Sequence, residues 1–163
     1  MTTGIVPHDM KIARIIPIFK YGNKHLFNNY RPISILPAFS KVLEKVISIK
    51  LITYLESQKL IYEHQYGFRS KHSTLHPIIH LLNQIAYAID KSSKNLTLSV
   101  FIDLSKAFDT IYYEILLQQL NNLGVRGIPN LWFRNYLTDR KQYMDIYNIR
   151  SSLESLNCGV PLS

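Results

Sequence analysis

The sequence has few of the residues on which several kinds of protein chemistry depend. It holds one cysteine, Cys158, so no disulfide can form within the chain, and we expect a small core side chain rather than a nucleophile. No apolar run reaches the roughly 18 residues of a membrane-spanning helix. The first residues have neither the basic nor the apolar part of a signal peptide, so we expect an intracellular protein with no membrane partner.

Common phosphate-binding and hydrolase motifs are also missing. The sequence contains no Gly-x-x-x-x-Gly-Lys-Ser/Thr loop, no Gly-x-Gly-x-x-Gly and no Gly-x-Ser-x-Gly elbow. His72, His76 and His80 are spaced four apart, but no cysteine or acid lies near them in the sequence. Because a helix is expected to begin at Ser73, after the first histidine, a metal site there is not favoured.

The composition indicates one globular domain with an uneven charge. The 163 residues are 47% hydrophobic and 18% charged, which argues against disorder. Residues 1–95 carry 13 Lys/Arg and 5 Asp/Glu, whereas residues 96–163 carry 6 of each. A basic part joined to a neutral part that bears acids suits a polyanion held near a metal-binding carboxylate. A solvated basic surface with no specific partner is an equal alternative.

The hydrophobic periodicity predicts an α+β fold, because helices and strands are mixed without regular alternation. Extended segments over 11–19 and 29–36 predict a hairpin with basic residues on both arms. Helices are predicted over 38–58, 74–90, 112–123 and 129–137. Further strands are predicted over 96–103, 142–149 and 152–158.

The most informative stretch covers residues 100–110, Val-Phe-Ile-Asp-Leu-Ser-Lys-Ala-Phe-Asp-Thr. An apolar run predicts a buried strand that ends on Asp103. An unpaired charge beside a core is costly, so a magnesium ion is the expected counter-charge, since it prefers oxygen ligands. Asp109, six residues on, is expected to be a helix cap or a turn former.

Three further side chains suit a nucleotide. Lys20 and Arg31 lie on the two arms of the predicted hairpin. The ammonium of lysine is a point charge and the guanidinium of arginine donates two parallel hydrogen bonds, and polyphosphate sites often combine the two. The alternative is two solvated surface charges. Phe108 would be either a core aromatic or a flat wall against a sugar ring.

Five blocks of the sequence resemble the reverse transcriptase domain of non-LTR retrotransposons, especially the jockey-like elements of animals. They occur in the family's order and are distributed along nearly the whole chain. The blocks are Ala-Arg-Ile-Ile-Pro-Ile-Phe-Lys (13–20), Asn-Tyr-Arg-Pro-Ile-Ser-Ile-Leu-Pro (29–37), Gln-Tyr-Gly-Phe-Arg (65–69) followed by His-Ser-Thr (72–74), Phe-Ile-Asp-Leu-Ser-Lys-Ala-Phe-Asp-Thr (101–110) and Cys-Gly-Val-Pro (158–161).

The resemblance implies a right-hand polymerase fold, with fingers over 1–95 and a partial palm over 96–163. It implies RNA-directed DNA synthesis from dNTPs, with an RNA template, a DNA primer and two Mg²⁺ ions. The oligomeric state stays open.

The resemblance also assigns roles to individual residues. Asp103 would be the first metal-binding carboxylate, and the Leu104 carbonyl would add an oxygen. Lys20 and Arg31 would bind the triphosphate, and the backbone at Lys106 and Ala107 would contact the nucleotide. Phe108 would be a steric gate that excludes a ribose 2′-hydroxyl. The template or the cleft would be contacted by Gln65, Gly67 and Arg69.

The sequence departs from the family after Pro161, where Leu162 and Ser163 stand in place of Gln-Gly-Ser. An aromatic-x-Asp-Asp turn and a thumb are missing, and no Asp-Asp pair occurs anywhere. We therefore expect a piece of a longer reading frame, or a decayed copy, that cannot hold two ions and is inactive alone. The alternatives are a non-enzymatic basic RNA- or DNA-binding protein, and a remnant with uncovered apolar faces around Val100 and Ile102.

Overall fold

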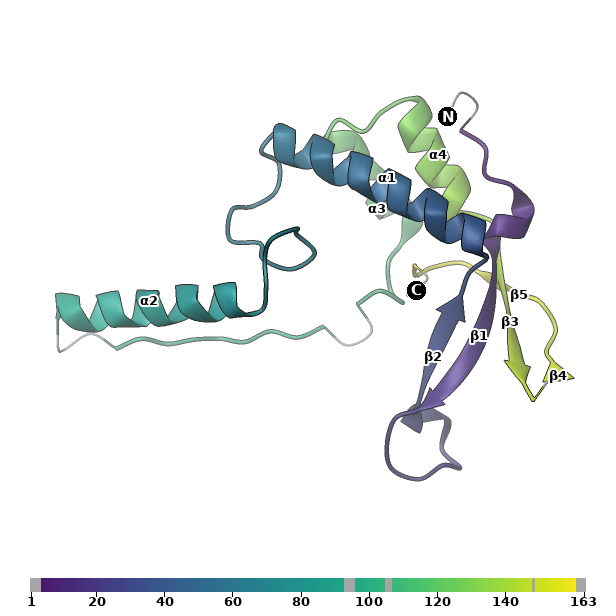
Figure 1. The fold of residues 1–163 in the computed structure, drawn as a ribbon, viewed down its shortest axis with the longest axis horizontal. Coiled ribbons are helices and arrows are strands. Elements are labelled where there is room, and N and C mark those ends of the chain that lie inside the picture. The colour runs from purple at the N-terminus through teal and green to yellow at the C-terminus, as the bar shows by residue number, and fades with distance from the viewer. Residues whose placement is uncertain (1–3, 93–95, 105–106, 148, 161–163) are drawn as a thin grey trace. The chain divides into compact units, whose positions relative to one another are not determined.

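The computed structural model describes residues 4–92, 96–104, 107–147 and 149–160 (Figure 1). The chain divides into two compact units, one made of residues 1–51 and 105–163 and the other of residues 52–104. The boundary falls inside helix α1 (Ala38–Ser57). Across the described ranges, none of the helices has the length and apolar character needed to cross a membrane.

The first unit is built on an antiparallel hairpin of β1 (Ile12–Phe19) and β2 (Tyr30–Ile35), which confirms the predicted pairing. Alternate β1 side chains are buried, as the two-residue period of a half-buried strand requires. Gly22 in the connecting turn has φ +87°, and a Cβ there would lie 2.9 Å from the Asn29 side-chain nitrogen. The turn therefore requires glycine at this position.

Strand β3 (Arg140–Ile146) extends this sheet, parallel to β1. Strands β4 (Ile149–Arg150) and β5 (Glu154–Leu156) both pair antiparallel with β3. The predicted strand over 142–149 and its antiparallel partner over 152–158 are thus confirmed with different bounds, because β3 begins two residues earlier and ends at Ile146, and β5 is shorter than predicted. The sheet combines strands from the N-terminal and C-terminal parts of the chain, in the order β2-β1-β3-β4.

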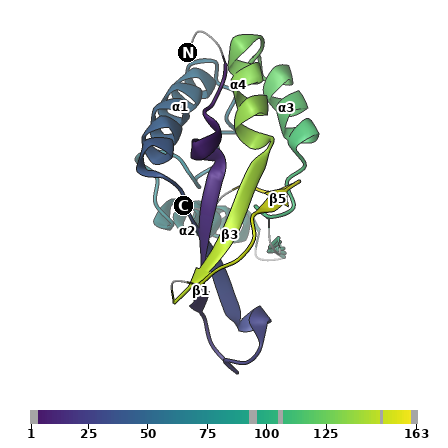
Figure 2. The same ribbon diagram turned by 90° about the vertical axis from the view of Figure 1, so that its right-hand side faces the viewer.

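Helices pack at the end of the sheet where β1 begins. Figure 2 shows α1, α4 (Ile128–Leu137) and α3 (Tyr113–Asn122) beside one another there. Their shared core consists of Val6, Tyr113, Leu117, Trp132, Tyr136 and Leu137, with Leu43 and Ile47 of α1 packed against it. These helices confirm the predicted ones, and Gly124 with φ +90° follows α3 where a C-terminal stop was expected.

The same end of the unit contains buried polar groups. Arg140 is fully buried, stacks 4.7 Å from the Tyr136 ring centroid and donates through Nη1 to the Tyr136 carbonyl oxygen at 3.2 Å. Its Nε and Nη2 have no hydrogen-bond partner among the described residues. Lys11 is also buried, and this burial lowers the pKa of its ammonium, with Asp139 opposing and Arg140 adding to the shift.

The second unit consists of the last turns of α1, a loop over 58–74, helix α2 (Leu75–Lys91) and residues 96–104. Helix α2 confirms the predicted helix, and it starts after His72 as expected. The helical spacing of its apolar residues predicts a core stripe of Ile78, Leu81, Leu82, Ile85 and Ile89. This stripe is not buried, because α2 has no buried residue among those described. The stripe was predicted from periodicity, which identifies an apolar face but not the surface that covers it.

The predicted buried strand over 96–103 is not present in the structure. Residues 96–104 lie in no helix or strand and are exposed, and Asp103 therefore does not end a strand. Val100 and Ile102 are 74% and 85% exposed, which agrees with the expectation of uncovered apolar faces around them. An apolar run indicates a strand that could be buried, whereas burial itself requires a neighbouring strand, and no described strand pairs with this segment.

Candidate nucleotide site

The hairpin brings Lys20 and Arg31 to the same face of the sheet. Arg31 lies opposite Ile18 in the β1–β2 register, and the Lys20 amide continues the ladder by donating to the Asn29 carbonyl oxygen at 2.8 Å. Because side chains alternate along a strand, Lys20 and Arg31 share a face, whereas Pro32 and Ser34 both point to the opposite face.

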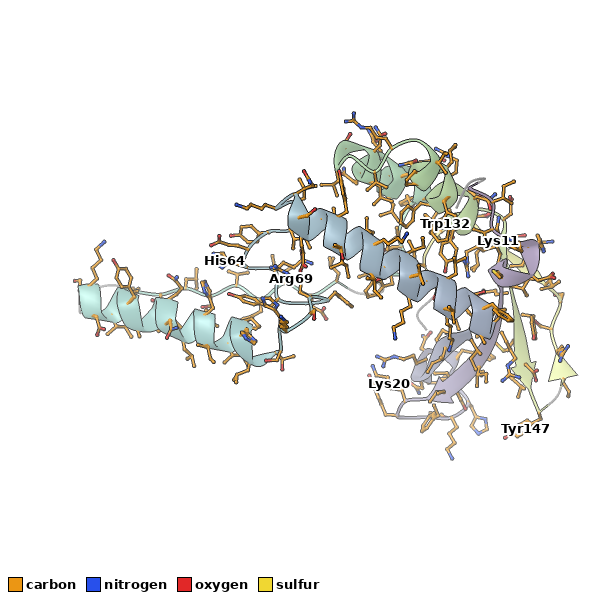
Figure 3. All side chains as sticks on the ribbon, turned by 45° about the horizontal axis from the view of Figure 1, so that its top comes forward. Lys11, Lys20, His64, Arg69, Trp132 and Tyr147 are labelled. Atoms are coloured by element: carbon orange, nitrogen blue, oxygen red, sulfur yellow. The ribbon has the colours of Figure 1, made fainter. Side chains whose placement is uncertain are left out.

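The charges on this face differ in their partners. Arg14 and Arg150 both approach Asp145 Oδ2, at 3.8 and 3.7 Å. Lys20 has no carboxylate partner among the described residues, and its Nζ lies 5.0 Å from the Tyr21 ring centroid. Arg31 likewise forms no ion pair with the described part of the chain and is exposed. Lys20 and Arg31 are thus cations available to an external anion (Figure 3 labels Lys20).

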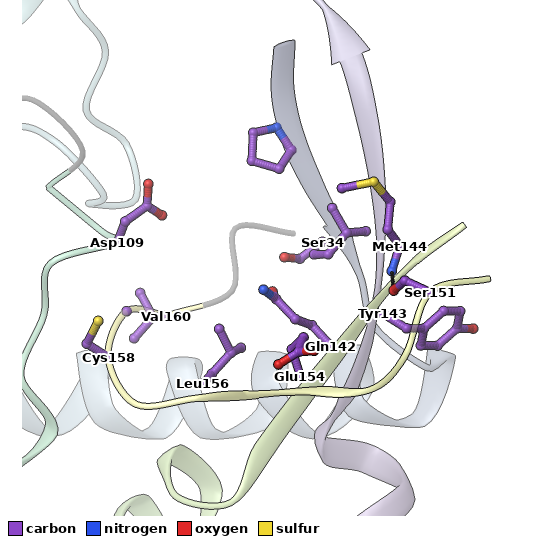
Figure 4. A pocket seen from close by; sticks show the side chains of 13 residues that line it. Ser34, Asp109, Gln142, Tyr143, Met144, Ser151, Glu154, Leu156, Cys158 and Val160 are labelled. Atoms are coloured by element: carbon purple, nitrogen blue, oxygen red, sulfur yellow. Dashed lines mark hydrogen bonds between the residues drawn. The ribbon is translucent and has the colours of Figure 1, made fainter. Parts of the chain in front are cut away.

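A cavity of about 440 Å³ opens on the opposite face of the same sheet. Its floor includes Ser34, Gln142 and Met144. Cys158 and Val160 of the C-terminal segment and Asp109 of the turn over 107–110 also line it (Figure 4). Glu154 on β5 provides a second carboxylate. Glu154 and Gln142 were not predicted as site residues, because their only signal in the sequence is their place in predicted strands.

The end of the 101–110 block lies against the 158–160 segment. The Gly159 amide donates to the Ile111 carbonyl oxygen and the Val160 amide to the Phe108 carbonyl oxygen, both at 2.9 Å. Gly159 has φ +81°, and a Cβ there would lie 3.0 Å from the Asp109 carbonyl oxygen. Two blocks that are about 50 residues apart in the sequence therefore meet through their backbones, and only glycine fits the contact.

The structure decides the role of Asp109 and corrects the expectation for Cys158. Asp109 lies in the turn over 107–110, which confirms a turn former, but it does not cap α3, whose N-cap is Tyr112 without a side-chain hydrogen bond. Cys158 is an exposed free thiol that lines the cavity, so the expected core position is wrong.

The proposed metal ligands lie in the other unit. Asp103 and Leu104 are exposed. Within the part of the chain that the structure describes, no three His, Cys, Asp or Glu side chains are placed to hold a metal ion. One carboxylate and one carbonyl do not fit a two-ion magnesium site, so no reaction step can be derived through such ions from these residues.

Three residues after Asp103 are predicted to contact the nucleotide. Ala107 is half-buried, and Phe108 is 38% exposed, with its carbonyl oxygen accepting a hydrogen bond from the Val160 amide. Lys106 lies outside the described residues.

The predicted template residues form one turn. Gln65 Nε2 donates to the Gly67 carbonyl oxygen and Arg69 Nη1 to the Gln65 carbonyl oxygen, both at 3.4 Å. Arg69 Nε lies 3.6 Å from Glu56 Oε1, which ties the turn to the end of α1. Tyr66 in this turn lies among the rings of His72, His76 and His80, with centroids 5.9 to 6.4 Å away. The four-residue histidine spacing therefore produces an aromatic cluster.

The model of the family described as "Reverse transcriptase (RNA-dependent DNA polymerase)" matches residues 20–163. The chain belongs to this reverse transcriptase family. It is 31% identical over 159 residues to a protein described as "Probable RNA-directed DNA polymerase from transposon X-element", from Drosophila melanogaster, covering 95% of this chain. It is 29% identical over 164 residues to the "RNA-directed DNA polymerase from mobile element jockey" of the same species, covering 99% of this chain.

These similarities confirm the resemblance to the reverse transcriptases of jockey-like retrotransposons. A third relative, "Probable RNA-directed DNA polymerase from transposon BS", also from Drosophila melanogaster, is 31% identical over 156 residues. The chain spans 17% of the length of each of these curated relatives. The reverse transcriptase family match begins at Lys20, so the first hairpin arm lies largely before it.

Proposed function

We propose that this chain contributes the fingers (1–95) and part of the palm (96–163) to an RNA-directed DNA polymerase of a non-LTR retrotransposon. The reaction would be template-directed transfer of nucleotides from dNTPs to a DNA primer on an RNA template. The observation that carries the proposal is the family match over residues 20–163, which includes four of the five blocks completely.

Lys20 and Arg31 support a triphosphate-binding role. They share one face of the hairpin, and neither is neutralised by a described carboxylate. A triphosphate carries several negative charges, and a guanidinium can bind two of its oxygens at once while an ammonium adds a point charge. Their role in the reaction would be to hold and orient the nucleotide.

Phe108 and the backbone at Lys106 and Ala107 would contact the nucleotide from the palm. The hydrogen bond from the Val160 amide fixes the Phe108 backbone, which supports a ring held in place as a steric gate. Such a ring would exclude a ribose 2′-hydroxyl by overlap rather than by a lost hydrogen bond. Gln65, Gly67 and Arg69 would contact the template or shape the cleft.

Magnesium would supply positive charge to the transferring phosphate when bound. This chain would contribute only part of the ligand set, with Asp103 as one carboxylate ligand and the Leu104 carbonyl as one further oxygen. Manganese can probe this assignment, because it broadens the NMR signals of nearby nuclei even when it binds weakly. Broadening around residue 103 that disappears in Asp103→Asn but persists in Asp109→Asn would support it, and equal broadening in both variants would contradict it.

Primer extension tests the expected inactivity of these 163 residues. The sequence offers no Asp-Asp pair, so we expect no incorporation of dNTPs on a primed RNA template with magnesium. Incorporation that is lost in Asp103→Asn would show instead that the chain forms a working site.

A non-enzymatic RNA- or DNA-binding protein is the second candidate, and the charge excess in residues 1–95 favours it. Binding by lysine and arginine releases counterions, so affinity for RNA would fall steeply with salt. An affinity for RNA that stays constant between low and moderate salt would exclude this candidate. It would leave the family assignment unchanged.

A further inference from the structure

Helix α1 carries an apolar stripe on the side that does not face the core. Within the first unit, Leu43 and Ile47 pack against the core, whereas Phe39, Val42, Val46 and Ile49 are 76%, 63%, 43% and 57% exposed. We call these four exposed residues the outer stripe. A helix of this unit therefore has two apolar faces, of which only one is covered by described residues.

The spacing of the outer stripe is that of a helix-packing seam. Its members follow one another at intervals of three, four and three residues, which is the a/d pattern of a heptad repeat over two heptads. Such a narrow seam fits one facing helix. A helix that lies in a membrane surface presents a wider apolar face, so the stripe favours a protein helix.

Lysines border this seam on both sides. Lys45 precedes Val46 at the g position, and Lys50 follows Ile49 at the e position. Both are exposed, and neither forms an ion pair with a described residue. Glu44 is the one acid in 38–51, and it accepts the hydrogen bond of the Tyr136 hydroxyl on the inner side. The charged side chains at the rim of the outer stripe are thus both basic, and the other two e and g positions hold the apolar residues Ala38 and Leu43.

The charge of the rim argues against a second copy of this chain as the occupant. In an antiparallel pair each g position meets g and each e meets e, and in a parallel pair g meets e. Lysine would face lysine in both arrangements, which is unfavourable for pairing. The fitting occupant has acids at these positions.

We propose that the outer stripe of α1 docks an amphipathic helix of another protein, with apolar residues at its a and d positions and Asp or Glu at its e and g positions. The apolar seam would provide the buried area, and Lys45 and Lys50 would select the acidic partner and its register. This site lies on the helix surface opposite the core and is separate from the proposed polymerase chemistry.

Two labelled synthetic helices test the proposal by fluorescence anisotropy with the 163-residue protein. Both have leucine at a and d, and one has glutamate at e and g whereas the other has lysine. We expect the glutamate peptide to bind about tenfold or more tightly than the lysine peptide, from the charge difference at the rim. Equal affinities, or no binding of either peptide, would overturn the proposal.

Variants distinguish binding at the outer stripe from non-specific hydrophobic binding of the peptides. Val42→Ser with Val46→Ser should abolish peptide binding, while Ile115→Ser, which removes an exposed isoleucine of α3, should not change it. Lys45→Glu with Lys50→Glu should reverse the preference toward the lysine peptide. Because all these side chains are exposed, far-UV circular dichroism should be unchanged in each variant. Binding to phosphatidylserine vesicles but to neither peptide would replace the proposed partner with a lipid surface.

Discussion

Gly159 lies so close to Asp109 that a Cβ at position 159 would be 3.0 Å from the Asp109 carbonyl oxygen and 3.1 Å from its Cα. The glycine also has φ +81°, which L side chains rarely adopt. This contact joins the turn after the apolar block to the last described residues, and it positions one wall of the 440 Å³ cavity.

Gly159→Ala should therefore destabilise the first unit by about 1–3 kcal/mol, because strain in φ adds to the close approach. Gly127→Ala is the matched control, since Gly127 also has a positive φ of +62° but nothing lies within 4 Å of its added Cβ. Urea unfolding of both variants measures the difference. A Gly159 variant as stable as the Gly127 variant would show that the close approach adds no cost.

Tyr136 and Glu44 should make the protein sensitive to alkali. Burial first, and then the hydrogen bond to Glu44, raise the pKa of the Tyr136 phenol above its ordinary value near 10. A raised pKa in the folded state means that the stabilisation is complete below the unfolded pKa and declines as the pH rises beyond it. Thermal unfolding should show a falling midpoint above about pH 10.

Tyr136→Phe tests the same pair at neutral pH. It leaves Glu44 without its hydroxyl donor, so we expect a loss of about 1–3 kcal/mol. Tyr147→Phe changes a tyrosine that is exposed and should leave unfolding unchanged. If both variants unfold alike, the Tyr136 hydroxyl does not support the fold.

Glu114 and Arg134 form a two-pronged ion pair at 2.7 and 2.9 Å between α3 and α4. The hydrogen bond from Arg134 lowers the pKa of the Glu114 carboxyl. A lowered folded-state pKa gives stabilisation that is present above the unfolded pKa and lost as the pH falls through the folded one. An NMR titration should find the Glu114 pKa higher in Arg134→Gln than in the parent chain. No change between them would show that the pair does not form in solution.

Arg140→Met should be tolerated although Arg140 is fully buried. Two of its nitrogen donors lack a partner among the described residues, and methionine keeps much of the apolar stem. Replacing a poorly satisfied buried charge is often neutral or stabilising, so we expect a stability within about 1 kcal/mol of the parent or above it. The pKa of Lys11 should rise, since Arg140 lowers it. A loss of several kcal/mol, with no movement of that pKa, would contradict this view of the buried cluster.

Local pattern was sufficient for most elements. The hairpin, the four helices and, within a few residues, strand β3 follow from periodicity and from stops such as Gly124, which act locally along the chain. The segment over 96–103 shows the limit, because its apolar composition is strand-like and its burial depends on a distant partner strand. The core stripe predicted for α2 failed for the same reason.

In the candidate site, too, local features could be predicted from the sequence and long-range contacts could not. Lys20 and Arg31 were expected on two arms of one hairpin, and the register places them on one face. The contact of Gly159 with Asp109 joins residues about 50 positions apart, so spacing within either block could not reveal it. Cys158, which was expected in the core, is exposed beside that contact. The roles of Asp103, Phe108 and the turn over 65–69 stay predictions.

The exposed segment over 96–102, Leu-Thr-Leu-Ser-Val-Phe-Ile, has no charge, proline or glycine, and its backbone amides and carbonyls are in no described ladder. Segments of this composition readily stack into intermolecular cross-β assemblies. The colloidal behaviour of the isolated polypeptide at high concentration should therefore depend on these seven residues more than on its net charge of +8.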